Sequence, residues 1–191
     1  MPRRPSRPEP KEDRTPLPAW AAICFLASGA AGLLYEVVWS KQLSYILGNS
    51  LQAVSTVVAA FLGGLAIGAY LLGARVARLR RGARAYAALE LGIGLLGLLS
   101  MPALRGLDPI VGVLYRAFGG ETGPMMLGRF LLLFGMLLPP TVLMGATLPV
   151  LVAHFEYRGV GPALARLYAI NTAGAVLGSA LGGFVLLPGV P

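Results

Sequence analysis

Four charged residues lie within otherwise apolar stretches of this sequence, and their side chains have the clearest chemical potential. Two are acidic, Glu36 and Glu90, and two are basic, Arg129 and Arg166. A charged group inside an apolar helix is costly to bury unless it meets an opposite charge or lines a polar cavity. The sequence therefore predicts either ion pairs that hold helices together or a cavity that admits a cationic or zwitterionic ligand.

The composition indicates a membrane protein. Hydrophobic residues make up 56% of the 191 residues and charged residues only 13%, which is too apolar for a soluble domain of this size. The net charge of +8 would usually raise nucleic acid as a partner. Here the basic residues flank apolar stretches, so anionic lipid headgroups are the better match and nucleic acid is not expected. Cys24 is the only cysteine, so no disulfide can form within the chain.

Five apolar stretches are long enough to cross a bilayer, which predicts an all-α, polytopic transmembrane helix bundle. Residues 1–18 are rich in proline and charge and are expected to form a disordered basic cytoplasmic tail, followed by a transmembrane helical domain over 19–191. The apolar run after the tail is too long for a signal peptide, so the first span is expected to be retained. The expected spans are residues 19–39, 51–74, 85–104, 125–155 and 164–187.

The segments between the spans carry weaker signals. Residues 41–50 are expected to form a short external connection, with Gly48, Asn49 and Ser50 as turn residues. Residues 106–120 are too short to cross the membrane, and an interfacial helix is expected there. Its apolar residues share one helical face: Leu107, Ile110, Val111 and Leu114.

Prolines and polar residues mark the last two spans. Pro139 and Pro140, with Pro149 beyond them, remove backbone donors, so the fourth span is expected to be split. Broken helices border transport sites in some membrane proteins, although kinks without function are commoner. Asn171 in the fifth span is expected to hydrogen-bond to a neighbouring helix or to line a cavity.

The stretch RVARLRRGAR, residues 75–84, predicts the orientation. It holds five arginines and no acid between the second and third spans, and such loops stay in the cytoplasm. Twelve of the sixteen basic residues then lie on one side. The predicted location is the plasma (inner) membrane, multi-pass, with a cytoplasmic N-terminus. At the resulting depths Glu36 would pair with Arg129 near the outer surface, and Glu90 with Arg166 near the inner one.

Glycines recur every four residues in two spans. They are Gly64 and Gly68 in the second span, and Gly174, Gly178 and Gly182 in the fifth. Small residues at this spacing let two helix backbones approach closely. The pattern predicts helix packing within the chain, with the interface of a homo-oligomer as the alternative.

No arrangement of residues predicts catalysis or metal binding. The sequence shows no nucleophile with a neighbouring base, and its glycine pairs lie inside spans rather than after strands, as a phosphate-binding loop would require. His154 is the only histidine and has no second ligand nearby. No catalytic residue, metal or cofactor is expected.

Five stretches carry a resemblance to a known family: SGAAGLLYEVVWSKQL (28–43), AFLGGLAIGAYLLGARVAR (60–78), YAALELGIG (86–94), LLPPTVLMGATLPVL (137–151) and LYAINTAGAVLGSALGGFVLLPGV (167–190). They resemble the membrane region of spermidine synthase-like integral membrane proteins, which are relatives of polyamine aminopropyltransferases. Many members end in a Rossmann-like aminopropyltransferase domain, whose glycine-rich motif is absent here. The resemblance implies membership without carrying catalysis onto these residues, so whether the chain is part of an enzyme stays open.

A second resemblance concerns the arginine-rich stretch, which is similar to the loop at the same place in major facilitator transporters but lacks the usual aspartate. It implies a six-helix, half-transporter-like arrangement. The odd number of spans also leads us to expect further sequence after Pro191.

Three functions stay open at this point. The first is a membrane module that binds, and in the strongest form moves, a polyamine-like cation through a bundle containing Glu36 and Glu90. The second is a membrane anchor for an aminopropyltransferase domain absent from this chain. The third is a structural or partner-binding helical membrane protein. Sequence beyond Pro191 would discriminate best between the first two.

Overall fold

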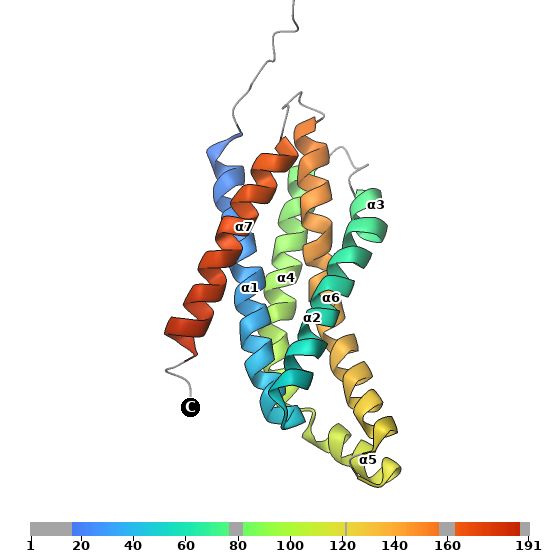
Figure 1. Ribbon diagram of the computed structural model, residues 1–191. Helices are drawn as coiled ribbons and strands as arrows, with labels where there is room; N and C mark the ends of the chain where they lie inside the picture. Colours follow the sequence, from blue (N-terminus) through green and yellow to red (C-terminus); the bar gives the residue numbers. More distant parts are fainter. Residues whose placement is uncertain (1–16, 77–81, 121, 157–162, 188–191) are drawn as a thin grey trace, which may run out of the picture.

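The computed structural model describes residues 17–76, 82–120, 122–156 and 163–187, and all regular structure in these ranges is helical (Figure 1). The first half comprises α1 (Ala19–Leu47), α2 (Ser50–Ile67), the π-helix η1 (Gly68–Gly73), α3 (Ala74–Val76) and α4 (Gly82–Arg105). The second half comprises α5 (Asp108–Phe118), α6 (Gly123–Glu156), α7 (Ala163–Leu181) and the π-helix η2 (Gly182–Leu186). The predicted all-α fold is confirmed.

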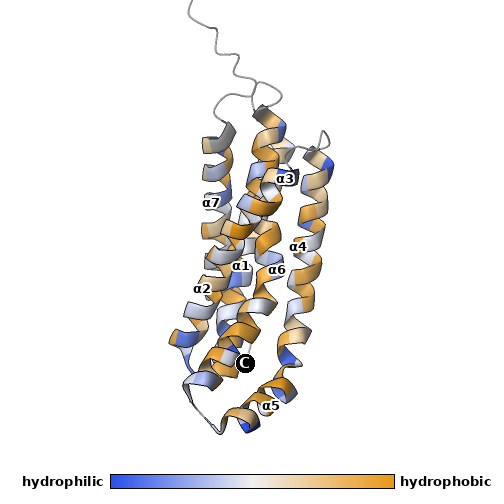
Figure 2. Ribbon diagram, turned by 90° about the vertical axis from the view of Figure 1, so that its right-hand side faces the viewer, coloured by the Kyte–Doolittle hydropathy of each residue, from blue (hydrophilic) through white to orange (hydrophobic). Residues whose placement is uncertain are grey.

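Five helices in this part of the chain are long and apolar enough to cross a membrane. They cover residues 19–47, 50–73, 82–105, 123–155 and 165–186. Figure 2 shows hydrophobic residues along the full length of the bundle, and many are exposed, such as Leu91 (76%) and Phe184 (84%). Such a surface is favourable against lipid and unfavourable against water. The five helices fit a multi-pass membrane protein, whereas a six-helix, half-transporter-like arrangement stays a prediction.

The helices alternate in direction along the bundle. In Figure 1, α1, α4 and α7 run downward, and α2 and α6 run upward. The start of α1, the end of α3 and the start of α4 therefore share one end of the bundle with the end of α6 and the start of α7. Much of the arginine-rich stretch, residues 77–81, and most of the tail, residues 1–16, lie outside the described residues.

Two buried apolar clusters hold the bundle together, one toward each end. The upper cluster joins α1, α4, α6 and α7 through residues that include Phe25, Tyr86 and Phe155. The lower cluster contains Trp39 and Leu137, both 0% exposed. Within the lower part, Trp39 Nε1 donates a hydrogen bond of 2.8 Å to the hydroxyl oxygen of Ser100, and that hydroxyl donates to the Gly97 carbonyl.

The two glycine rows lie at helix interfaces inside the bundle. On α7, a Cβ atom at Gly178 would lie 2.6 Å from the carbonyl carbon of Ala30 on α1, and Gly174 also faces α1. On α2, Gly64 faces Thr141 of α6, and a Cβ at Gly68 would lie 2.8 Å from the carbonyl carbon of Val142. The absence of side chains at these positions lets the paired helices approach backbone to backbone.

The expected extent of the connection over residues 41–50 is wrong, whereas its turn at Gly48 and Asn49 is confirmed and its external position stays a prediction. Helix α1 continues to Leu47, so only Gly48 and Asn49 separate it from α2. Gly48 has a φ of 65°, and the Asn49 side chain caps α2 by accepting from the backbone N–H groups of Leu51 and Gln52. The helix extends because Leu43 is fully buried in the lower cluster, which offsets the polarity of its neighbours.

The expected break in the fourth span is also wrong, because α6 is continuous and contains all three prolines. Close packing against α2 supports the helix there. The Thr141 hydroxyl lies 2.9 Å from the Leu137 carbonyl oxygen in its own helix and 3.1 Å from the Ala60 carbonyl oxygen in α2. Neighbouring helices and threonine hydroxyls make proline tolerable inside a transmembrane helix in this way.

The short helix expected between the third and fourth spans is present as α5, which joins α4 to α6. Leu107, just before it, is buried and Val111 packs against the lower cluster, whereas Ile110 is 47% exposed. Asp108 in the first turn and Arg116 in the last turn complement the helix dipole.

Candidate intramembrane polar cluster and groove

Glu90 forms a polar cluster with two neutral side chains inside the bundle. It lies on α4, eight residues after Gly82, so it is about 12 Å along the helix axis from that end. Its carboxyl group interacts with the hydroxyl groups of Ser28 on α1 and Tyr86 one turn earlier on α4. Glu90 is half-buried, and Tyr86 is only 4% exposed. The cluster therefore places an acid about a third of the way along α4, beside two neutral hydroxyl groups.

Hydrogen bonding within this cluster is incomplete. The Tyr86 hydroxyl and Oε1 of Glu90 are buried and have no hydrogen-bond partner of ordinary geometry in the described ranges. Buried polar atoms without a partner are uncommon and costly, because the lost hydration is not replaced. The cluster thus has unused capacity to accept a hydrogen bond from a ligand donor at Glu90.

A groove of about 400 Å³ lies directly beside this cluster. Residues of α1, α2, η1, α6 and α7 line it. Its apolar surface includes Phe25, Phe61, Leu65 and Met144, and its polar groups come from Ser28, Thr147, Tyr168, Asn171 and Thr172. The volume lies within the range of pockets that bind small molecules, about 300–1,000 Å³.

Ser28 connects the groove to the acid. It lines the groove and also interacts with the carboxyl group of Glu90, which is not itself a lining residue. The Phe25 ring, which lines the groove too, lies 6.3 Å from the Tyr86 ring between centroids. A ligand group next to Ser28 would therefore lie close to the only acid of this cluster.

Asn171 occupies the groove wall on α7. It packs over Gly29 of α1: a Cβ at Gly29 would lie 2.8 Å from its Oδ1 atom. The neighbouring Thr172 hydroxyl donates to the Tyr168 carbonyl oxygen at 2.8 Å. Of the two roles expected for Asn171, the structure places it where it lines a cavity.

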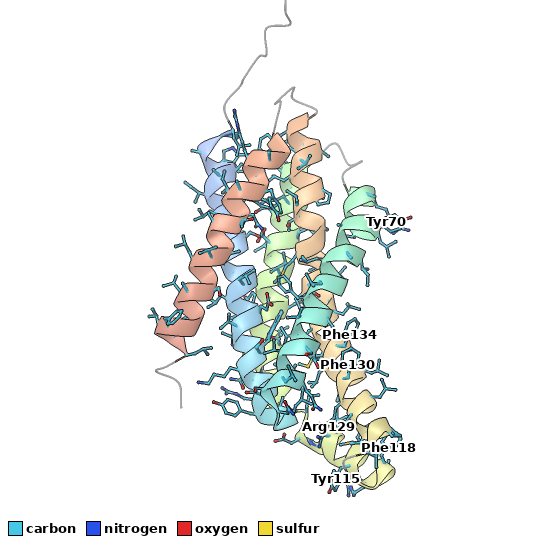
Figure 3. All side chains as sticks on the ribbon, viewed as in Figure 1. Tyr70, Tyr115, Phe118, Arg129, Phe130 and Phe134 are labelled. Atoms are coloured by element: carbon cyan, nitrogen blue, oxygen red, sulfur yellow. The ribbon has the colours of Figure 1, made fainter. Side chains whose placement is uncertain are left out.

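The other three charged residues do not lie in this cluster. Arg166 is exposed near the start of α7, and no ion pair joins it to Glu90 in the described part of the chain. Glu36 is half-buried on α1. Arg129 lines a different pocket, between α2 and α6 at the lower end of the bundle (Figure 3). The ion pair between Glu36 and Arg129 stays a prediction.

Comparison with known proteins gives one informative similarity. The chain is 32% identical over 167 residues to polyamine aminopropyltransferase 2 of Streptomyces coelicolor (strain ATCC BAA-471 / A3(2) / M145). This chain is similar to part of a polyamine aminopropyltransferase. The match covers 83% of this chain and 27% of that protein, so the chain spans about a quarter of the relative's length.

The other two comparisons find nothing. No family model matches the sequence, and no solved structure matches the fold. The partial match to the polyamine aminopropyltransferase supports a distant spermidine synthase-like relationship at most, which agrees with the resemblance seen in the sequence. That this chain belongs to the membrane-bound branch of that family stays a prediction.

Sequence reasoning singled out Glu90 and Asn171 but missed Ser28 and Tyr86. A signal for Tyr86 was available, because residues four apart on a helix lie on the same face and Tyr86 precedes Glu90 by four. No such signal exists for Ser28, since it reaches the cluster from another helix. Within the described residues, no group of three or more metal-ligating side chains comes together.

Proposed function

We propose that this chain is the membrane module of a polyamine aminopropyltransferase-like protein and that it binds a polyamine-like cation beside Glu90. The observation that carries the proposal is the buried Oε1 atom of Glu90, which has no hydrogen-bond partner in the described ranges. Ser28 and Tyr86, its polar neighbours, are neutral and leave the charge of an ionised carboxyl uncompensated. A cation would supply the missing partner and reduce the penalty of burying that charge.

The groove suits the rest of such a ligand. A polyamine carries ammonium groups on an apolar stem, so its site needs an acid next to apolar surface. An ammonium at Ser28 would face Glu90, while the stem could lie along Phe25, Phe61 and Met144. Asn171 offers an amide oxygen that can accept a hydrogen bond from a second ammonium. Movement of the cation across the bilayer would be a further property of the same site.

Thermal stabilisation by spermidine tests this proposal. Purified protein at physiological ionic strength should melt at a higher temperature with spermidine, because a ligand that binds only the folded state adds about 2.7 kcal/mol at one hundred times its Kd. Glu90→Gln removes the charge while keeping the shape and should abolish the rise. Glu36→Gln is the matched control, since Glu36 is also a half-buried acid but does not line the groove.

Two results would count against cation binding at Glu90. One is an equal rise in all three proteins. The other is the same rise from magnesium at matched charge concentration. Either would indicate general screening of surface charge rather than a site. If spermidine does bind at Glu90, a flux assay in liposomes would test whether the protein also transports it, because transport requires a binding site.

A second candidate, a membrane anchor, is favoured by the coverage of the similarity. The matching stretch amounts to 27% of the relative, which leaves room in that protein for a separate domain. If the gene encodes an aminopropyltransferase domain after Pro191, deletion of the bundle should release that domain from the membrane with its activity intact. Loss of spermidine binding with the bundle would instead favour the first candidate.

The location that we propose is the plasma (inner) membrane with the N-terminus in the cytoplasm. Support comes from the basic residues, twelve of sixteen of which fall on one side when the arginine-rich stretch is cytoplasmic.

A further inference from the structure

A second pocket, separate from the groove, lies at the lower end of the bundle where α2 and α6 begin. Its volume is about 360 Å³, and it is bordered by the first turns of both helices and by the last residue of α1. Arg129 lies six residues after Gly123, so it is about 9 Å along the axis from the start of α6. Figure 3 places Arg129 and Phe130 low on α6 beside α2. Helix α6 has 34 residues, so it is about 51 Å long and exceeds a hydrocarbon core of about 30 Å by roughly 10 Å at each end if centred. On that basis Arg129 would lie near the boundary between headgroups and acyl chains.

Among the described residues, the polar side of this pocket holds groups that can donate hydrogen bonds and no acid. Arg129 supplies a guanidinium, Gln52 an amide, and Ser55 and Thr56 supply hydroxyls, and none of the described aspartates or glutamates lines the pocket. Arg129 has another interaction in the structure, but a guanidinium carries five N–H donors and can serve more than one partner. The Gln52 amide nitrogen lies 3.9 Å from the sulfur of Met126, a weak acceptor that is easily replaced. Such a set of donors favours an anion.

The other side of the pocket is apolar and faces outward. Met126 is 44% exposed and Leu127 is 57% exposed. Phe130 lies next to them, with its ring 5.5 Å from the Phe134 ring between centroids. A small soluble anion would gain nothing from this surface, whereas an acyl chain would bury it.

We propose that this pocket binds the phosphodiester group of an anionic phospholipid, with Arg129 as the main contact and the acyl chain along Met126, Leu127 and Phe130. Arginine suits this role because its planar guanidinium can donate two parallel hydrogen bonds to one phosphate. Basic pockets between transmembrane helices recognise lipid headgroups on the same principle. The site is independent of the cation site proposed beside Glu90, because none of its lining residues lines the groove.

Arg116 provides a matched control at the same end of the bundle. It lies on α5, where its Nε atom donates to the Gly112 carbonyl oxygen at 3.2 Å, and it does not line this pocket. Replacing it removes the same charge near the same membrane surface. General attraction of anionic lipid would therefore fall equally in both arginine variants, and a specific site would be lost only with Arg129.

Native mass spectrometry of the detergent-purified chain, titrated with dioleoyl phosphatidylglycerol or dioleoyl phosphatidylcholine, tests the proposal. We expect one phosphatidylglycerol per chain to bind wild type and Arg116→Gln alike, and to bind Arg129→Gln about tenfold more weakly, the loss of one charge-assisted contact. Gln52→Leu should also weaken binding and serves as the second variant if Arg129→Gln does not fold. Phosphatidylcholine should bind weakly to every protein.

Two results would overturn the proposal. The first is phosphatidylglycerol binding that is unchanged in Arg129→Gln and Gln52→Leu. The second is displacement of the lipid by glycerol phosphate or inorganic phosphate at equal concentration, which would show that a soluble phosphate and not a lipid occupies the pocket.

Discussion

Gly178→Ala should destabilise the bundle although it adds only a methyl group. The added Cβ atom would lie 2.6 Å from the carbonyl carbon of Ala30 and 2.7 Å from its Cα, whereas ordinary contacts are 3.4–4 Å. Both opposing atoms belong to the backbone of α1, so no side chain can rotate away. The helices α1 and α7 must separate, and the contacts that flank Gly174 and Gly182 would loosen with them.

The expected cost is about 1–3 kcal/mol, typical of overpacking at a close interface. A change of 1 kcal/mol shifts Tm by about 2–4 °C in a chain of this size, so the melting temperature should fall by several degrees. The loss can be measured in detergent from intrinsic fluorescence, because Trp39 is fully buried and reports on exposure of the core.

Gly94→Ala is the matched control, and its expected change in Tm is zero or positive rather than negative. Gly94 lies inside α4, and an added Cβ there would meet nothing within 4 Å. Alanine is a better helix former than glycine by about 1 kcal/mol, so Gly94→Ala should leave Tm unchanged or raise it. Equal Tm changes in the two variants would refute the close packing of α7 on α1.

Two further predictions concern the lower core and the orientation. Ser100→Ala should lower the free energy of unfolding by about 1–3 kcal/mol, because it leaves the buried Trp39 Nε1 donor unpaired, and it should shift the tryptophan emission. An unchanged Tm would mean that this hydrogen bond contributes nothing to stability. In a cysteine-free background, Arg80→Cys should react with an impermeant thiol reagent only from the cytoplasm, and Asn49→Cys and Gly120→Cys only from outside; labelling at position 80 in intact cells would reverse the proposed orientation.

Several features of the fold could be predicted from the chain alone. The five spans follow from the length and apolarity of their stretches, since a helix is the only single segment that satisfies its own backbone in lipid. The turn at Gly48 and Asn49 was also readable, because glycine accepts a positive φ and asparagine caps helices. Local chemistry of this kind does not depend on which helices become neighbours.

Prediction failed where neighbours outweighed local preference. Pro139 and Pro140 predict a break, yet α6 is continuous because α2 packs against it and the Thr141 hydroxyl lies within hydrogen-bonding distance of the Ala60 carbonyl oxygen. The segment after Lys41 reads as a polar connection, yet α1 continues through it because Leu43 is buried in the lower cluster. Both outcomes depend on contacts between helices far apart in the sequence.

The candidate site, too, could be predicted from the sequence only in part. Glu90 stands out in the sequence because an acid in an apolar span is costly and therefore informative. Its neighbour on another helix, Ser28, and the groove that Ser28 shares with Asn171 arise only when α1, α4, α6 and α7 pack together. Hydrophobic length is a property of one helix and can be read along the chain. Which polar atoms meet inside the bundle depends on the rotation and close approach of separate helices, and only the tertiary structure decides that.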